Sequence, residues 1–146
     1  MSFAPIRNKI KEKLQTIDSI QQVEDYPSNE FNGYPAAMVA STRNENEFNT
    51  TTENKRIYVF TVYVLQEMKV LGEKQARRII EEVVDDIIEA FDQDQLLASV
   101  NINTVLPDNE CMVMSAPILG EIYNEDEGKY VVGQLEIGVT IQFDIN

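Results

Sequence analysis

Two stretches of the chain place apolar residues at steps of three and four, which is the spacing of an amphipathic helix. The first runs from Phe3 to Ile20, and its stripe consists of Ile6, Ile10, Leu14, Ile17 and Ile20. The second follows Gly72 and runs from Glu73 to Phe91, with a wider stripe formed by Ala76, Ile79, Ile80, Val83, Val84, Ile87, Ile88 and Phe91. Because such stripes must be buried, both segments are predicted to be helices that cover a sheet.

The rest of the apolar pattern predicts strands. Residues 36–41 form a short strand, and residues 56–65 are rich in β-branched and aromatic residues on both faces, which favours an inner strand covered by helices on one side. Residues 111–123 form a strand interrupted by Pro117, which favours an edge position or a bulge. Residues 130–145 alternate for their whole length, so one face belongs to the core and the other to solvent. A short strand at 100–105 is a further candidate.

Two helices that cover four or five strands predict an α+β fold, namely a two-layer sandwich with a mainly antiparallel sheet and both helices on one face. A chain of 146 residues is most simply one domain, residues 1–146.

Residues 43–55 contain four Asn and three consecutive Thr, so a mobile hairpin loop is predicted there. Phe48 is the one large apolar residue in this loop, and it either anchors a partner or folds back on its own hairpin.

The net charge of −13 argues against a surface that grips DNA phosphates or anionic lipid, because the long-range field repels both. The sequence contains neither a signal-peptide pattern nor an apolar run long enough for a membrane span, so no membrane partner is expected. Cys111 is the one cysteine, which excludes an intramolecular disulfide, and its apolar strand predicts a buried, inert thiol.

Both predicted helices place their charges against the helix dipole, which favours anions at the start and cations at the end by about 0.3–1 kcal/mol per exposed group. The first helix begins with basic residues and ends near Asp18, whereas the second begins with Lys74, Arg77 and Arg78 and ends with acidic residues. This reversal indicates charge placed for an outside partner, or else weak, salt-screened penalties that are tolerated. The predicted interface residues are Arg7, Lys9, Lys11, Lys13, Phe48, Glu82, Asp85, Asp86 and Glu89.

The residue types favour a protein that is not an enzyme. The chain has no histidine, which removes the usual general base and the common Ser/His and Cys/His nucleophile pairs. Its six glycines form no phosphate-binding loop, and the acidic clusters on the second helix and at residues 124–128 lack the ligand spacing of a metal site. No catalytic residue, metal or cofactor is therefore predicted, and a small acidic hydrolase is kept as a less favoured alternative.

Four segments together resemble the tail terminator, or tail completion, family of long-tailed bacteriophages, which includes proteins similar to the lambda minor tail protein U. They are Ile6-Arg7-Asn8-Lys9-Ile10 near the start, the segment 31–39 before the first strand, the aromatic-rich strand 56–62 after a polar loop, and the terminal strand segment 133–139. The resemblance covers nearly the full length of the chain.

The resemblance implies a structural protein, without catalytic residues, that forms a six-fold ring on the finished tail tube, stops its growth and offers a surface to the head. Its partners would be itself, the tail tube protein and the head–tail connector protein, and its location would be the virion tail, assembled in the bacterial host cytoplasm. DNA would pass through without specific binding, and we expect acidic residues to line the hole because they repel phosphate. Another neck, connector or tail-tube component and a non-phage adaptor are the alternatives. A homohexamer and a monomer that closes only on its target both remain open for the free protein.

Overall fold

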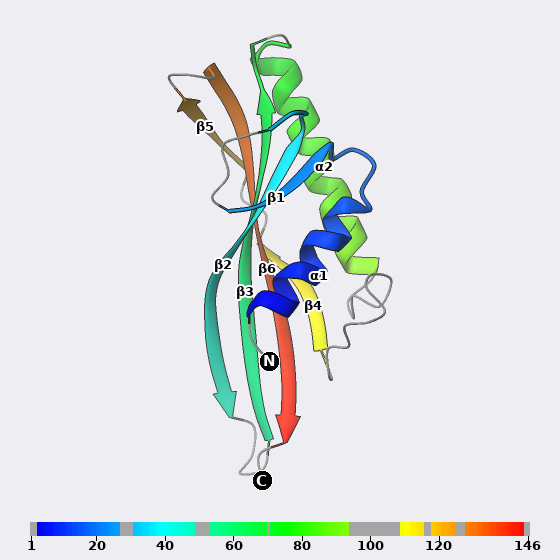
Figure 1. The fold of residues 1–146 in the computed structure, drawn as a ribbon, viewed down its shortest axis with the longest axis vertical. Coiled ribbons are helices and arrows are strands. Elements are labelled where there is room, and N and C mark those ends of the chain that lie inside the picture. Colours follow the sequence, from blue (N-terminus) through cyan, green and yellow to red (C-terminus); the bar gives the residue numbers. More distant parts are fainter. Residues whose placement is uncertain are drawn as a thin grey trace.

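A computed structural model describes residues 3–26, 31–48, 53–69, 71–93, 109–115, 118–124 and 128–144. The helices and strands are, in chain order, α1 (Phe3–Gln15), β1 (Gln22–Asp25), β2 (Ala36–Phe48), β3 (Glu53–Glu67), α2 (Glu73–Gln93), β4 (Asn109–Ser115), β5 (Ile118–Asn124) and β6 (Gly128–Asp144). Two helices and one sheet confirm the predicted α+β class (Figure 1).

The strands form one mixed sheet with the order β1-β2-β3-β6-β4, and β5 also pairs with β6. Every pairing is antiparallel except that of β1 with β2, so the prediction of a mainly antiparallel sheet is confirmed. The sheet has six strands, more than the four or five expected, because β1 has four residues and no long alternation to reveal it. Strands β4 and β5 pair with successive parts of β6, which confirms the edge position predicted for residues 111–123.

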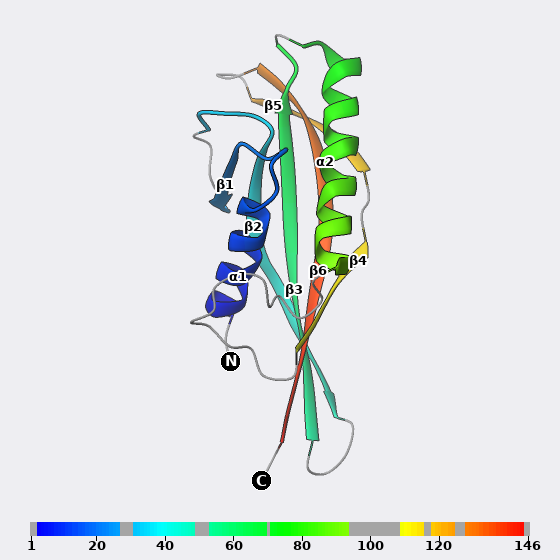
Figure 2. The same ribbon diagram turned by 90° about the vertical axis from the view of Figure 1, so that its right-hand side faces the viewer.

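One face of the sheet carries the main core. Alternate residues of β3, from Tyr58 to Val64, are buried in a cluster with the apolar stripes of both helices. Figure 2 faces this layer and shows α1 and α2 side by side in front of the strands. Phe3 of α1 packs edge-on against Tyr58 and Phe60, with ring centroids 5.2 Å and 5.8 Å away. Both helices therefore bury their stripes against the same side of β3, as periodicity predicts.

The first helix is shorter than predicted and ends at Gln15 rather than near Ile20. The N–H groups of Ile17 and Ile20 donate to carbonyls three residues back, each at 3.1 Å, so tight turns replace the helix. Thr16 Oγ1 donates to the Lys13 carbonyl at 2.6 Å, which satisfies one of the carbonyls left open at the helix end. Ile17 and Ile20 are still buried, and this is why the apolar spacing continues past the last helical residue.

The second helix begins where it was predicted. Gly72 has φ 80°, a conformation that residues with a Cβ rarely adopt, and its carbonyl accepts the Ala76 N–H at 3.1 Å. The helix continues to Gln93, two residues beyond the predicted end at Phe91. The long apolar period therefore identified this element correctly.

The region predicted as a loop at 43–55 is mostly strand. Strand β2 continues to Phe48, β3 begins at Glu53, and their pairing extends to Phe48 opposite Asn54. The prediction of a loop, which was based on polar composition, is wrong. Pairing with the long strand β3 holds this polar segment of β2 in the sheet. Residues 49–52 and the candidate strand at 100–105 lie outside the described residues, and mobility of the hairpin stays a prediction.

The opposite face of the sheet is only partly the wet surface expected from alternation in β6. Gln134 is exposed as predicted, but Tyr130 and Val132 on the same face are buried. They form a second cluster with Met38 and Leu65, and Phe31, Tyr34 and Tyr63 pack against it. The segment before β2 therefore supplies a small additional layer on this face, which alternation within one strand does not reveal.

Candidate interaction surfaces

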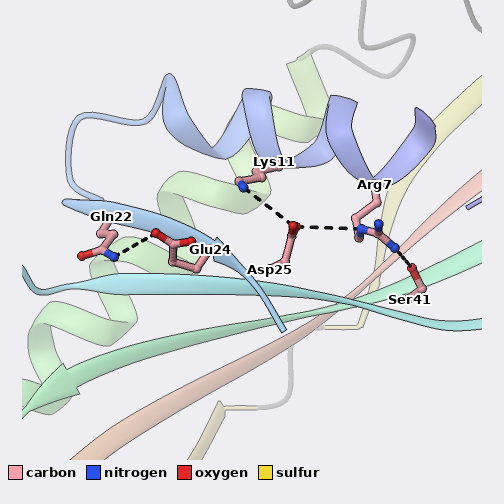
Figure 3. Close-up of polar contacts among 6 residues, drawn as sticks. All are labelled: Arg7, Lys11, Gln22, Glu24, Asp25 and Ser41. Carbon is pink, nitrogen blue, oxygen red and sulfur yellow. Dashed lines mark hydrogen bonds and ion pairs between the residues drawn. The ribbon is translucent and has the colours of Figure 1, made fainter. Parts of the chain in front are cut away.

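The basic side chains of α1 are partly used within the subunit. Arg7 and Lys11 lie one helical turn apart, and both approach Asp25 at the end of β1 (Figure 3). The Arg7 Nε–Asp25 Oδ1 and Lys11 Nζ–Asp25 Oδ2 distances are both 3.9 Å. Arg7 Nη1 also donates to Ser41 Oγ of β2 at 3.0 Å. Because the Asp25 side chain is 54% exposed, each ion pair contributes only about 0–1 kcal/mol to stability, but together they orient α1 on the sheet.

Lys9 and Lys13 differ from the predicted arrangement. Lys9 is only 4% exposed and is therefore buried in the subunit. The prediction that Lys9 contacts a partner at the surface is wrong. Lys13 lies in the last turn of α1, where the helix dipole favours a cation. The reversal of charge predicted for the first helix is wrong at this position, because the helix ends before Asp18.

The acidic residues predicted on α2 are at the surface. Glu82, Asp85, Asp86 and Glu89 are all exposed. Asp86 accepts a hydrogen bond from Ser19 Oγ at 2.8 Å, and Glu89 accepts one from Gln93 Nε2 at 3.2 Å. The last turn of α2 contains no basic residue, so the predicted reversal of charge is confirmed at this end, whereas Glu73 places an anion in the first turn.

The exposed cations gather at the other end of the same helix. Among the side chains that the structure describes, the exposed Lys and Arg residues are Lys69, Lys74 and Arg78. Arg77 is partly buried, and its Nε lies 3.1 Å from Glu73 Oε1. Lys69, Lys74 and Arg78 were absent from the predicted interface, although the reversed charges of the second helix could have pointed to them.

The sheet extends beyond both helices. The lower ends of β2, β3 and β6 project past α1 and α2 in both views (Figures 1 and 2). We name this part, residues 45–48, 53–57 and 140–144, the sheet extension; its strands remain paired from Ile57 opposite Thr140 to Glu53 opposite Asp144. Five strand residues span about 17 Å, so the extension is a substantial projection. Phe48 ends β2 within it, and an anchoring role for Phe48 stays a prediction.

An aromatic cluster on the sheet face away from the helices was not predicted. Tyr26 stacks on Tyr63 with centroids 5.4 Å apart, and Tyr34 lies 5.6 Å from Tyr130. The Tyr34 and Tyr130 hydroxyl oxygens are 3.2 Å apart, within hydrogen-bonding distance. Tyr26 is 53% exposed, whereas Tyr130 is buried. Tyr63 and Tyr130 lie in β3 and β6, whereas Tyr26 and Tyr34 lie outside the strands, so only the tertiary fold brings these residues together.

The described residues include no grouping of three or more His, Cys, Asp or Glu side chains placed to hold a metal ion. Cys111 lies in β4, at the edge of the sheet. No helix in the described part of the chain has both the length and the apolar character needed to cross a membrane.

Neither a protein-family model nor a curated protein matches this chain. The structure itself offers three surfaces that could contact a partner, namely the charged outer face of α2, the sheet extension and the aromatic cluster.

Proposed function

We propose that this chain is a structural virion protein that forms a ring on the tail tube of a long-tailed phage. The ring would end tube polymerisation and provide the surface to which the head attaches. The observation that carries the proposal is the division of the subunit into a helix-covered body and a sheet extension (Figures 1 and 2). A body of this kind can pack against neighbouring copies, while the projecting strands reach a second assembly.

The sheet extension has chemistry suited to contact with another protein. In the described part of the chain, strand pairing on the outer side of β2 stops at Val39, opposite Asp25, and β2 continues to Phe48. A strand edge presents backbone donors and acceptors that can add a strand from another chain. The end of a tail tube, where one layer of subunits has no successor, is the partner we propose for this edge.

The charge of the chain suits a ring through which DNA moves. A ring of subunits with a net charge of −13 each repels phosphate, so no long-range electrostatic attraction favours DNA binding. We propose that acidic residues predominate around the hole. A lumen lined mainly by Lys and Arg would contradict this part of the proposal.

The direct test is electron microscopy of purified protein, alone and mixed with tail tubes from the same phage, with light scattering to measure mass. The expected result is a discrete ring at tube ends and no further growth of capped tubes on addition of tube subunits. Long tubes formed by this chain alone would instead indicate a tail-tube subunit. Protein that neither forms a ring nor binds tube ends would overturn the proposal.

A further inference from the structure

We propose that α2 joins neighbouring copies of this chain, with the basic start of one helix against the acidic end of the next. The basic start comprises Lys69, Lys74 and Arg78, and the acidic end comprises Glu82, Asp85, Asp86, Glu89 and Asp92. This inference rests on the proposed ring and names the contact that would close it. The occupant of each charged surface is a second copy of the same chain.

The first observation is that, among the side chains that the structure describes, exposed positive charge lies at one place. Lys9 is buried, and Arg7 and Lys11 face Asp25 of their own subunit. The exposed cations among the described side chains are those of the basic start. The acidic end of another copy therefore finds its complementary surface at the start of α2 rather than on α1.

The second observation is that this arrangement is unfavourable within one subunit. Lys74 in the first turn and Asp92 in the last turn of α2 oppose the helix dipole, although Glu73 in the first turn is favoured by it. Glu81, Asp85 and Glu89 also follow one another at intervals of four residues on the exposed face, where like charges repel. A second copy that brings opposite charge to each end relieves both penalties.

The third observation is geometric. Lys74 and Glu89 are separated by about 22 Å along a continuous helix, which exceeds the screening length of about 8–10 Å in physiological salt. Arg78 and Glu82 are one turn apart and can pair within the helix, but Lys74 and the last acidic residues, Glu89 and Asp92, do not neutralise each other. The apolar side of α2 is committed to the core, where Ile80 and Val84 pack above Gly133. Its charged side is the side left for a neighbour.

Contact between the start of one helix and the end of the next joins two different surfaces, and repetition of such a contact closes a ring when the rotation between neighbours divides a full turn. Helices parallel to the ring axis would place like charges side by side in adjacent subunits. The proposal therefore orients α2 around the circumference of the ring.

Two complementary variants test the contact. Lys74→Glu with Arg78→Glu makes both ends of α2 acidic, and Glu82→Lys with Asp85→Lys replaces two anions of the acidic end by cations. Each variant alone should associate about tenfold more weakly at moderate salt, because about two exposed ion pairs per contact become repulsive. Each should change the Tm little, because all four positions are exposed and substitutions at the surface usually change stability by no more than about 0.5 kcal/mol. Weaker association without loss of Tm separates an interface role from a folding role.

An equimolar mixture of the two variants should restore assembly, because every contact in an alternating ring then joins opposite charges. The mass of the mixed species, measured by light scattering, distinguishes a ring from a dimer. A control with Gln15→Lys, Asp18→Lys and Gln21→Lys changes the net charge by the same amount as the Glu82/Asp85 variant but on exposed positions outside α2. This control should assemble like the unaltered protein.

Unaltered assembly of both variants would overturn the α2 contact but leave the ring intact. A mixture that forms only dimers would also overturn it, in favour of antiparallel pairing about a two-fold axis. Failure of the unaltered protein to form a ring, alone or on tubes, would instead overturn the proposed function. The three results are distinguishable in one series of measurements.

Discussion

Gly133 of β6 lies directly against Ile80 of α2. A Cβ atom at position 133 would be 2.8 Å from Ile80 Cγ2 and 3.0 Å from Val84 Cγ2. Atoms do not pack at such distances in a well-ordered core, so the absence of a side chain is what allows α2 to approach the sheet this closely. The charged face of α2 is held in place by this contact.

Gly133→Ala should therefore lower the free energy of unfolding by about 1–3 kcal/mol, the usual cost of overpacking a core. Urea denaturation followed by circular dichroism measures the change. The double variant Gly133→Ala with Ile80→Ala should lose less stability than the sum of the two single variants, because removal of the Ile80 methyl groups makes room for the new one. Additive losses of unfolding free energy would show that Gly133 and Ile80 do not pack against each other.

Lys9 and Lys11 provide a second comparison, because they lie on the same helix at very different depths. Lys9 is 4% exposed, whereas the Lys11 side chain is 26% exposed beside Asp25. Lys9→Glu should lower the free energy of unfolding by about 1–3 kcal/mol, since it forces an unmatched charge into a buried position. Lys11→Glu should cost only about 0–1 kcal/mol, as expected for an exposed pair. Equal Tm values for the two variants would contradict the burial of Lys9.

The outer aromatic cluster can be tested through its two hydroxyl groups. Tyr34→Phe and Tyr130→Phe each remove one partner of the 3.2 Å contact, and each should cost about 0.5–1.5 kcal/mol. The double variant should cost less than the sum, because the contact is already lost in either single variant. Strict additivity in urea denaturation would show that the two hydroxyls contribute independently.

Elements with long, uninterrupted periodicity could be predicted from the sequence. Helix α2 and strand β6 each repeat one pattern over many residues, so the side of each that faces the main core was evident. Strand β1 was missed because its parallel pairing with β2 depends on a segment distant in the chain. The polar half of β2 was assigned to a loop because its composition, taken alone, opposes a strand.

The candidate site was only partly predictable for a similar reason. The exposed acids of α2 followed from helical periodicity, since the apolar stripe fixes which side faces solvent. The pairing of Arg7 and Lys11 with Asp25 could not be foreseen, because it depends on how α1 lies across β1. The aromatic cluster likewise depends on how the segments that contain Tyr26 and Tyr34 pack on the sheet, which local patterns do not specify.

The hairpin between β2 and β3 should carry the contact with the tail tube but contribute little to folding. Replacement of residues 49–53 by Asn-Gly joins the paired residues Phe48 and Asn54 through a two-residue hairpin turn and shortens the reach of the sheet extension. The Tm should stay unchanged, because the core lies between the helices and the sheet, beyond the extension. Capping of tail tubes, counted by electron microscopy as the fraction of tube ends with a ring, should fall markedly, while ring formation at high protein concentration is kept. If the shortened protein caps tubes as well as the unaltered one, the tube contact lies elsewhere, and the aromatic face around Tyr26 becomes the next surface to alter.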